Sequence, residues 1–273
     1  MVAGLLTVVG LALVGWILMV GVLVLQERRL IFFPTRTYIA TPEDYGLHSD
    51  DLRVTVSDGT ELHGWWIHGA GDRVLVWYHG NTGNISDRLH NARLLVDRLG
   101  VGIVLVDYRG YGLSGGSPDE PGLYLDGLAI YDAVVARGVR PEDIVLFGRS
   151  LGGAVAVEVT LHRPVHAVVL ESAFRSVPAL ARIHYWFMPT SVIRTKLDSE
   201  SKIARVRVPK LFLHGDHDET VPIAHGRRLF ERAPAPKSFH EIAGAAHNDT
   251  YLVGGESYLD AWDTFLNTTG SGG

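Results

Sequence analysis

The chain has 273 residues, of which 47% are hydrophobic and 20% are charged, a size and composition that suit one large domain of helices and strands. The net charge of −5 provides no basic surface for nucleic acid. Because the sequence has no cysteine, disulfides, a thiol nucleophile and cysteine-ligated metal are excluded.

The first segment differs in composition from the rest of the chain. Residues 2–25 carry no charge, and a helix of this length is about 36 Å long, enough to cross a hydrocarbon core of about 30 Å. A cleaved signal peptide is the alternative, but it requires a basic start and a small-residue cleavage site. The segment instead ends in Leu25-Gln26-Glu27. We therefore expect a retained single-pass membrane anchor.

Charges and breakers after the span predict the topology. Arg28, Arg29 and Arg36 follow the span and no basic residue precedes it, so the positive-inside rule places the remainder of the chain in the cytoplasm. Aromatic residues among these arginines suit the headgroup level, and we assign residues 1–33 to an anchor with an interfacial segment. Proline and glycine breakers then mark residues 34–50 as a linker.

Residues 51–268 read as one α/β domain. Residues 52–56 and 61–68 alternate in hydrophobicity around an Asp-Gly turn, which predicts a hairpin. Continuous apolar runs follow, as in strands buried on both faces of a parallel sheet. These runs are 74–78, 103–106, 144–147, 167–170 and 211–213, and helical patterns separate them at 86–99, 123–137, 151–161, 223–233 and 257–267. The alternation predicts a mostly parallel sheet with helices on both faces, followed by a flexible tail at 269–273.

Ligands of such sheets bind at the carboxyl ends of the strands, so we expect functional residues directly after the apolar runs. The run 144–147 leads into Gly148-Arg149-Ser150-Leu151-Gly152. This G-x-S-x-G pattern between a strand and a helix is typical of a nucleophilic serine on a sharp turn. Close packing of a helix through small residues is the alternative.

A second loop could stabilise an oxyanion. His79-Gly80-Asn81 follows the run 74–78, and we expect the backbone N–H groups of Asn81 and Leu151 to be the two donors. A plain Asn-Gly turn is the alternative.

Candidates for the acid and the base follow the later strands. Three acids, Asp216, Asp218 and Glu219, follow residues 211–213. We expect Asp218 to orient the base. Asp216 is expected to bind backbone in an Asx-turn, and Glu219 to begin a helix. The pair of histidines in this loop lacks a third ligand for a metal site. His247 is the last histidine, in a small-residue loop, and is the expected base. The order Ser150, Asp218, His247 is that of the Ser…Asp…His hydrolases.

These motifs resemble the α/β-hydrolase superfamily, and within it the small membrane-anchored α/β-hydrolase domain-containing serine hydrolases. The resemblance runs through "ERRLIFFPTR", "DGTELHGWWI", "YHGNTGNISDRL", "VDYRGYGLSGGSP", "GRSLGGAVA", "HGDHDETVP" and "GAAHND". It implies an α/β-hydrolase fold with an eight-stranded, mostly parallel sheet, a serine triad on Ser150, Asp218 and His247, and no cofactor.

The resemblance also places a small cap at about residues 174–205, above the nucleophile. Tyr185, Trp186 and Phe187 in this cap are candidates for the wall of an acyl pocket, with core packing as the alternative. His79, Tyr108 and Tyr111 border the site and are further pocket candidates. Glu171 is a fallback for the triad acid.

The leading hypothesis is a membrane-anchored serine hydrolase that cleaves carboxylic esters, with lipid-derived esters and thioesters included. An aminopeptidase or acyl-peptide hydrolase is the alternative, and a non-catalytic scaffold tethered to the membrane is the second alternative. The expected partners are a small or lipid-like ester and the membrane; the sequence leaves the oligomeric state open. Because the anchor looks separable from the domain, a chain that starts near Thr35 is expected to hydrolyse a soluble ester at the full rate.

Overall fold

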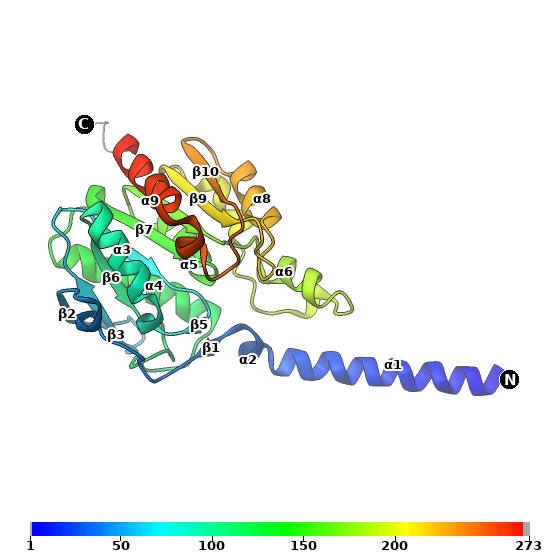
Figure 1. Ribbon diagram of the computed structural model, residues 1–273. Coiled ribbons are helices and arrows are strands. Elements are labelled where there is room, and N and C mark those ends of the chain that lie inside the picture. The colour runs from blue at the N-terminus through cyan, green and yellow to red at the C-terminus, as the bar shows by residue number, and fades with distance from the viewer. Residues whose placement is uncertain (1, 270–273) are drawn as a thin grey trace.

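An apolar helix at the N-terminus extends away from the domain (Figure 1). The computed structural model describes residues 2–269, and α1 (Val2–Leu25) projects outward from the rest of the chain (Figure 1). Almost all side chains of α1 are exposed, and α1 is long and apolar enough to cross a membrane, a test that a signal sequence also passes. The short helix α2 (Glu27–Ile31) then brings the chain onto the domain.

The centre of the domain is a twisted, mostly parallel sheet, as expected from the apolar runs. Within residues 2–269 it has eight strands, in the order β10-β9-β8-β7-β4-β6-β3-β2. Only the pairs β2·β3 and β3·β6 are antiparallel, which confirms the predicted hairpin at one edge. The strands are β2 (Ser49–Thr55), β3 (Glu61–Ile67), β4 (Val74–Tyr78), β6 (Gly102–Val106), β7 (Ile144–Arg149), β8 (Ala167–Glu171), β9 (Lys210–Gly215) and β10 (Lys237–Ile242).

Helices cover both faces of this sheet and bury two apolar cores. Alternate residues of one strand belong to different cores: Val74 and Val76 lie in one, and Leu75 and Trp77 in the other. Because both faces are covered, the central strands are continuously hydrophobic. The first core packs under α4 (Glu120–Ala136), α5 (Leu151–His162) and α8 (Ala224–Arg232), and the second under α3 (Leu89–Leu99) and α9 (Thr250–Thr269). Short 3-10 turns are η2 (Ile85–Arg88) and η3 (Pro141–Asp143).

The stretch expected as a linker lies against the domain. β1 (Phe33–Pro34) pairs in parallel with β5 (Thr82–Gly83), and η1 (Pro42–Tyr45) follows. The Tyr38 hydroxyl donates to Asp107 Oδ2 at 2.7 Å, and Leu47 is buried in the second core. These contacts tie the region after the apolar helix to the loop that carries β5 and to the second core of the domain.

The residues between β8 and β9 form a small helical cap. It contains α6 (Val177–His184), η4 (Thr190–Val192), α7 (Ser199–Lys202) and η5 (Ile203–Arg205). α6 and the loop after it extend on the same side of the domain as α1 (Figure 1). The predicted tail at 269–273 falls, apart from Thr269, outside the described residues, and Thr269 itself ends α9.

Candidate active site

Ser150 occupies a strained turn between β7 and α5. Its backbone angles, φ of 53° and ψ of −116°, lie in a region that residues other than glycine rarely adopt. The turn needs glycine nearby, because a Cβ at Gly152 would stand 1.9 Å from the carbonyl oxygen of Tyr78. The geometry lifts the Ser150 hydroxyl out of the strand and places it at the first turn of α5.

The structure brings Ser150, His247 and Asp218 into one hydrogen-bonded chain. His247 Nε2 lies 3.1 Å from Ser150 Oγ, and His247 Nδ1 lies 2.7 Å from Asp218 Oδ2. With the Nδ1 proton directed at Asp218, Nε2 is free to accept the proton of the serine hydroxyl. Three separate loops at the carboxyl ends of the strands therefore converge on one point.

Asp218 is arranged to stay ionised. Burial alone would raise its pKa, but the hydrogen bond and charge of His247 and the N–H of Val221 outweigh burial and lower it. The Val221 N–H donates to Asp218 Oδ1 at 2.7 Å, so both carboxylate oxygens are bound. Beside it, His214 donates from Nε2 to the carbonyl of Val221 at 2.7 Å, and burial lowers the pKa of His214. A neutral His214 thus supports the loop that holds the acid.

The other acidic residues have different roles. Asp216 Oδ1 accepts the N–H of Gly244 at 2.6 Å, so it binds backbone as expected, but in the loop after β10 rather than in an Asx-turn of its own loop. Glu219 does not begin a helix as expected, since α8 begins at Ala224; it is exposed and borders the cavity beside Ser150. Among residues 2–269 there is no group of three or more His, Asp or Glu side chains that could hold a metal ion.

Glu171, the fallback acid, is instead a buried structural anchor. It accepts hydrogen bonds from Arg149 Nε at 2.9 Å, Thr250 Oγ1 at 2.6 Å and the Tyr258 hydroxyl at 2.8 Å. Arg149 in turn donates to the carbonyl of His247 at 2.6 Å. Sequence reasoning missed this positioning role of Arg149, because the second position of G-x-S-x-G carries no signal of its own.

The two residues expected to supply the oxyanion donors lie beside Ser150. Asn81 and Leu151 both border the cavity next to Ser150. Leu151 is the first residue of α5, where N–H groups have no intrahelical acceptor, and no hydrogen bond among residues 2–269 uses the Asn81 N–H. Both groups are therefore available to an oxygen that gains negative charge beside Ser150.

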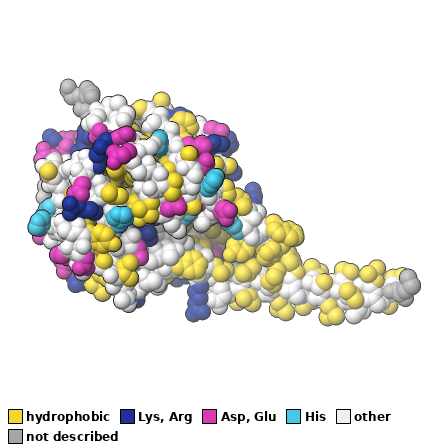
Figure 2. Space-filling model, viewed as in Figure 1, with side chains coloured by type: hydrophobic (Ala, Val, Ile, Leu, Met, Phe, Trp, Pro, Cys, Tyr) yellow, Lys and Arg dark blue, Asp and Glu magenta, His cyan; other side chains and the backbone are white. Residues whose placement is uncertain are grey.

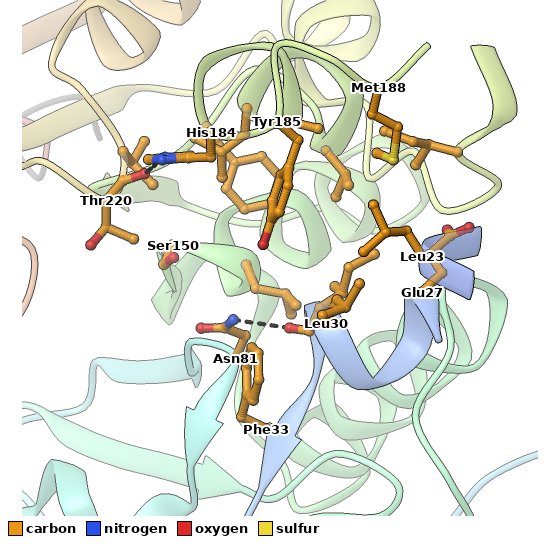
Figure 3. A pocket seen from close by; sticks show the side chains of 18 of the residues that line it. Leu23, Glu27, Leu30, Phe33, Asn81, Ser150, His184, Tyr185, Met188 and Thr220 are labelled. Atoms are coloured by element: carbon orange, nitrogen blue, oxygen red, sulfur yellow. Dashed lines mark hydrogen bonds between the residues drawn. The ribbon is translucent and has the colours of Figure 1, made fainter. Parts of the chain in front are cut away.

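The loop that carries Asn81 is held from both sides. The Asn81 carbonyl accepts the N–H of Phe33 at 2.9 Å and the hydroxyl of Tyr111 at 2.8 Å. The Asn81 side chain donates from Nδ2 to the carbonyl of Ile31 at 2.9 Å, as Figure 3 shows. The segment just after the apolar helix thus helps to fix the orientation of this peptide.

A cavity of about 740 Å³ opens in front of Ser150, within the usual range of about 300–1,000 Å³ for ligand sites. Figure 3 shows Tyr185 and Met188 reaching in from the cap, with Leu23, Glu27 and Leu30 on the opposite side. Most lining residues are apolar: Leu23, Val24, Leu30, Ile31, Phe33, Leu151, Phe174, Val177, Leu180, Ala181, Tyr185, Met188, Ile193 and Val221. Such a lining suits an uncharged, extended group.

Most of the predicted pocket residues lie elsewhere. Tyr185 lines the cavity as expected, but Trp186 points to solvent with 84% of its surface exposed, and Phe187 does not border the cavity. His79, Tyr108 and Tyr111 do not border it either, because they are fully buried behind the Asn81 loop.

These buried rings form a support for that loop. The rings of His79 and Tyr108 lie 4.3 Å apart between centroids, and the ring of Tyr111 lies 5.2 Å from that of His79. Burial lowers the pKa of His79 to about 3, so the imidazole is neutral. In the sequence these rings lie next to a glycine turn. That position does not show whether a ring packs beneath the loop or faces the substrate.

Residues from the N-terminal segment were missed altogether. Leu23, Val24 and Glu27 border the cavity, as do Leu30 and Phe33, which follow α1. The sequence predicted only a membrane location for them, because nothing in a hydrophobic run shows which side of it will meet a domain.

A serine that borders a cavity from a strand-to-helix elbow, with a histidine and an acid on later loops of the same sheet edge, is typical of the α/β hydrolases. The comparisons agree. The model of the alpha/beta hydrolase family matches residues 66–200. The chain belongs to the α/β-hydrolase superfamily.

Its relatives share most of its length. An uncharacterized protein of Mycobacterium tuberculosis is 37% identical over 89% of this chain and 88% of its own length. The alpha/beta hydrolase domain-containing protein WAV2 of Arabidopsis thaliana is 33% identical over 92% of this chain and 91% of its own. Among solved structures, a Pyrococcus furiosus esterase superposes with a TM-score of 0.73 at 20% identity, covering 87% of this chain and 98% of the esterase.

Proposed function

We propose that this protein is a serine hydrolase that cleaves carboxylic esters, with Ser150 as nucleophile, His247 as general base and Asp218 as the acid that orients it. The observation that carries the proposal is the hydrogen-bonded chain from Asp218 through His247 to Ser150, next to the free N–H groups of Asn81 and Leu151. The esterases among the structural neighbours share the fold, and this site is compatible with their chemistry.

The reaction follows from the positions of these groups. Ser150 Oγ attacks the ester carbonyl carbon while its proton passes to His247 Nε2, and the N–H groups of Asn81 and Leu151 stabilise the oxyanion. The C–O bond to the alcohol then breaks, and His247 returns the proton to the departing oxygen. Water repeats the sequence on the acyl-enzyme, which releases the carboxylic acid and restores Ser150.

The cavity favours an ester over a peptide with a free amine. An aminopeptidase needs a carboxylate that binds the substrate's ammonium group. Glu27 lines the cavity, but its carboxylate already accepts the N–H groups of Arg194 and Thr195. Glu219 is exposed to water, where such a pair contributes little. An uncharged acyl group therefore suits the lining best, and a purely non-catalytic scaffold would have no need of an aligned triad.

We also propose that α1 is a retained single-pass anchor and that the domain of residues 51–268 faces the cytoplasm. The contacts of α1 itself support retention, since cleavage after the apolar run would remove Leu23 and Val24 from the cavity wall and the hydrogen bond from Trp16 to Phe187. The arginines after the span support the orientation.

A fluorophosphonate probe, together with hydrolysis of p-nitrophenyl esters and aminoacyl amides, tests the proposal. We expect labelling of the wild type and of Ser172→Ala, a control at a buried serine with positive φ, and none of Ser150→Ala. Ser150→Ala should lose at least about 10³-fold in kcat while staying folded. Labelling of Ser150→Ala, or more than about a tenth of the wild-type activity, would show that another residue is the nucleophile.

A further inference from the structure

The cavity in front of Ser150 is built between the cap and the end of the apolar helix. Leu23 and Val24 of α1 and Glu27 and Leu30 of α2 form one side. Residues of the cap form the other, and Figure 3 shows Met188 facing Leu23 across the cavity. A helix that served only to tether the domain would have no reason to contribute side chains to the site.

The two sides are connected by hydrogen bonds along their length. Glu27 accepts the backbone N–H groups of Arg194 and Thr195, at 3.1 and 2.6 Å. Further out, Trp16 Nε1 donates to the carbonyl of Phe187 at 3.1 Å. The cap therefore follows α1 outward from the domain, and the cavity between them is not a random gap.

These contacts bring the tip of the cap to the depth of the membrane span. Trp16 precedes Leu25, the end of α1, by nine residues, which is about 14 Å along a helix. Interfacial segments bury their apolar side about 5–10 Å into the boundary between headgroups and acyl chains. The tip is suited to that zone, because Ile183, Tyr185 and Trp186 are all exposed. Figure 2 shows apolar side chains continuing from α1 onto the adjoining part of the domain.

We propose that the cavity receives its substrate from the bilayer: an acyl ester of a membrane-resident amphiphile, whose acyl chain lies between α1–α2 and the cap while its ester group reaches Ser150. The proposal rests on the proposed function. An acyl chain that moves between the bilayer and this cavity stays in apolar surroundings, whereas extraction through water exposes every methylene. The substrate class is thus set by a wall that the anchor itself supplies.

A photoreactive activity probe tests this placement in the full-length protein in phosphatidylcholine nanodiscs. The probe is a hexadecyl fluorophosphonate with a diazirine at the far end of the chain. Ser150 displaces fluoride, and light then links the end of the chain to its neighbours. We expect crosslinks to peptides that contain residues 16–30 and 183–188. Labelling of Ser150 with crosslinks only to other parts of the domain would overturn the inference, whereas absence of labelling would overturn the proposed function.

A pair of neighbouring substitutions gives a second test. Leu23 lines the cavity, whereas Leu25 does not border it and is 81% exposed. Leu23→Trp should lower the ratio of kcat/KM for a palmitoyl ester to that for an acetyl ester several-fold, since the indole fills the space of a long chain. Leu25→Trp, the control, should leave the ratio unchanged. An unchanged ratio in Leu23→Trp, in a protein that still reacts with the probe at Ser150, would show that the acyl chain runs elsewhere.

Discussion

The carboxyl edge of the sheet and the wall formed by α1, α2 and the cap both border Ser150, but different forces hold them. At the sheet edge, Asp218 follows the fully buried strand β9 and His247 follows the neighbouring edge strand β10, and short polar hydrogen bonds fix the orientation of both side chains. At the wall, apolar surfaces meet with few polar contacts, and these join distant parts of the chain, such as Trp16 and Phe187. In the proposed function, the chemistry thus depends on local loop geometry, whereas the proposed fit of the substrate depends on how distant segments dock.

The largest effect should come from the acid at the sheet edge. Asp218→Asn removes the charge that orients His247 and should lower kcat by about 10⁴-fold. Asp216→Asn is the matched control, because its remaining oxygen can still accept the Gly244 N–H, and it should lose less than about tenfold. Ester hydrolysis by the two purified variants decides this. Equal losses, or a greater loss at Asp216, would move the role of the acid to Asp216.

A second prediction separates positioning from chemistry at the same edge. Glu171→Gln leaves Arg149 without its buried partner and should reduce the free energy of unfolding by about 3 kcal/mol, as is typical when one partner of a buried ion pair is removed. Its kcat, corrected for the folded fraction, should decrease far less than in Asp218→Asn. Denaturant unfolding and active-site titration measure the two quantities. A loss of kcat comparable to that of Asp218→Asn, without loss of stability, would make Glu171 a participant in the chemistry.

The wall should matter even for a soluble substrate, contrary to what the sequence led us to expect. A chain that begins at Thr35 lacks Ile31 and Phe33, so Asn81 loses one hydrogen bond to its carbonyl and one from its side chain. We expect about a tenfold lower kcat for an acetyl ester, less than the loss of a whole oxyanion donor.

A chain that begins at Gln26 is the control for this truncation. It lacks α1 but keeps the segment that contacts Asn81, and it should retain most of the activity on the acetyl ester. Equal activity in the two truncated proteins and the full-length protein would show that the N-terminal segment does not position the loop.

The smallest effect concerns a histidine near the cap that has no place in the reaction. His225 Nδ1 accepts the N–H of Arg175, and burial, with help from the positive charge of Arg175, lowers the pKa of His225 to about 4 from an ordinary value of 6.5. Between these values the unfolded chain binds a proton that the folded chain does not, so stability is lost as the pH falls through this window.

His225→Gln keeps an acceptor for Arg175 and cannot titrate. The melting temperature of the wild type should therefore decrease by a few degrees more than that of the variant between pH 7 and pH 4. Equal decreases in melting temperature in the two proteins would show that folding does not lower the pKa of His225.

Much of the sheet edge could be predicted from the sequence, because its signals are local. The run before Gly148 predicts a strand, the glycines around Ser150 permit a sharp turn, and Asp218 and His247 follow later strands in the order typical of this family. Asp218 could be preferred over Asp216 for the same reason, since position within a short loop largely determines which side chain can reach across the edge.

The tertiary structure alone decided what surrounds that edge. In the sequence, Glu171 is a candidate acid and Arg149 is a loop residue with no assigned role. The structure shows that the two are paired in the interior. The hydrophobicity of residues 2–25 predicts a span, yet only docking shows that Leu23 faces the cavity and that Phe33 holds the Asn81 loop. Hydrophobic burial is non-directional, so an apolar pattern determines that a segment will be covered but leaves its partner to the packing of the whole chain.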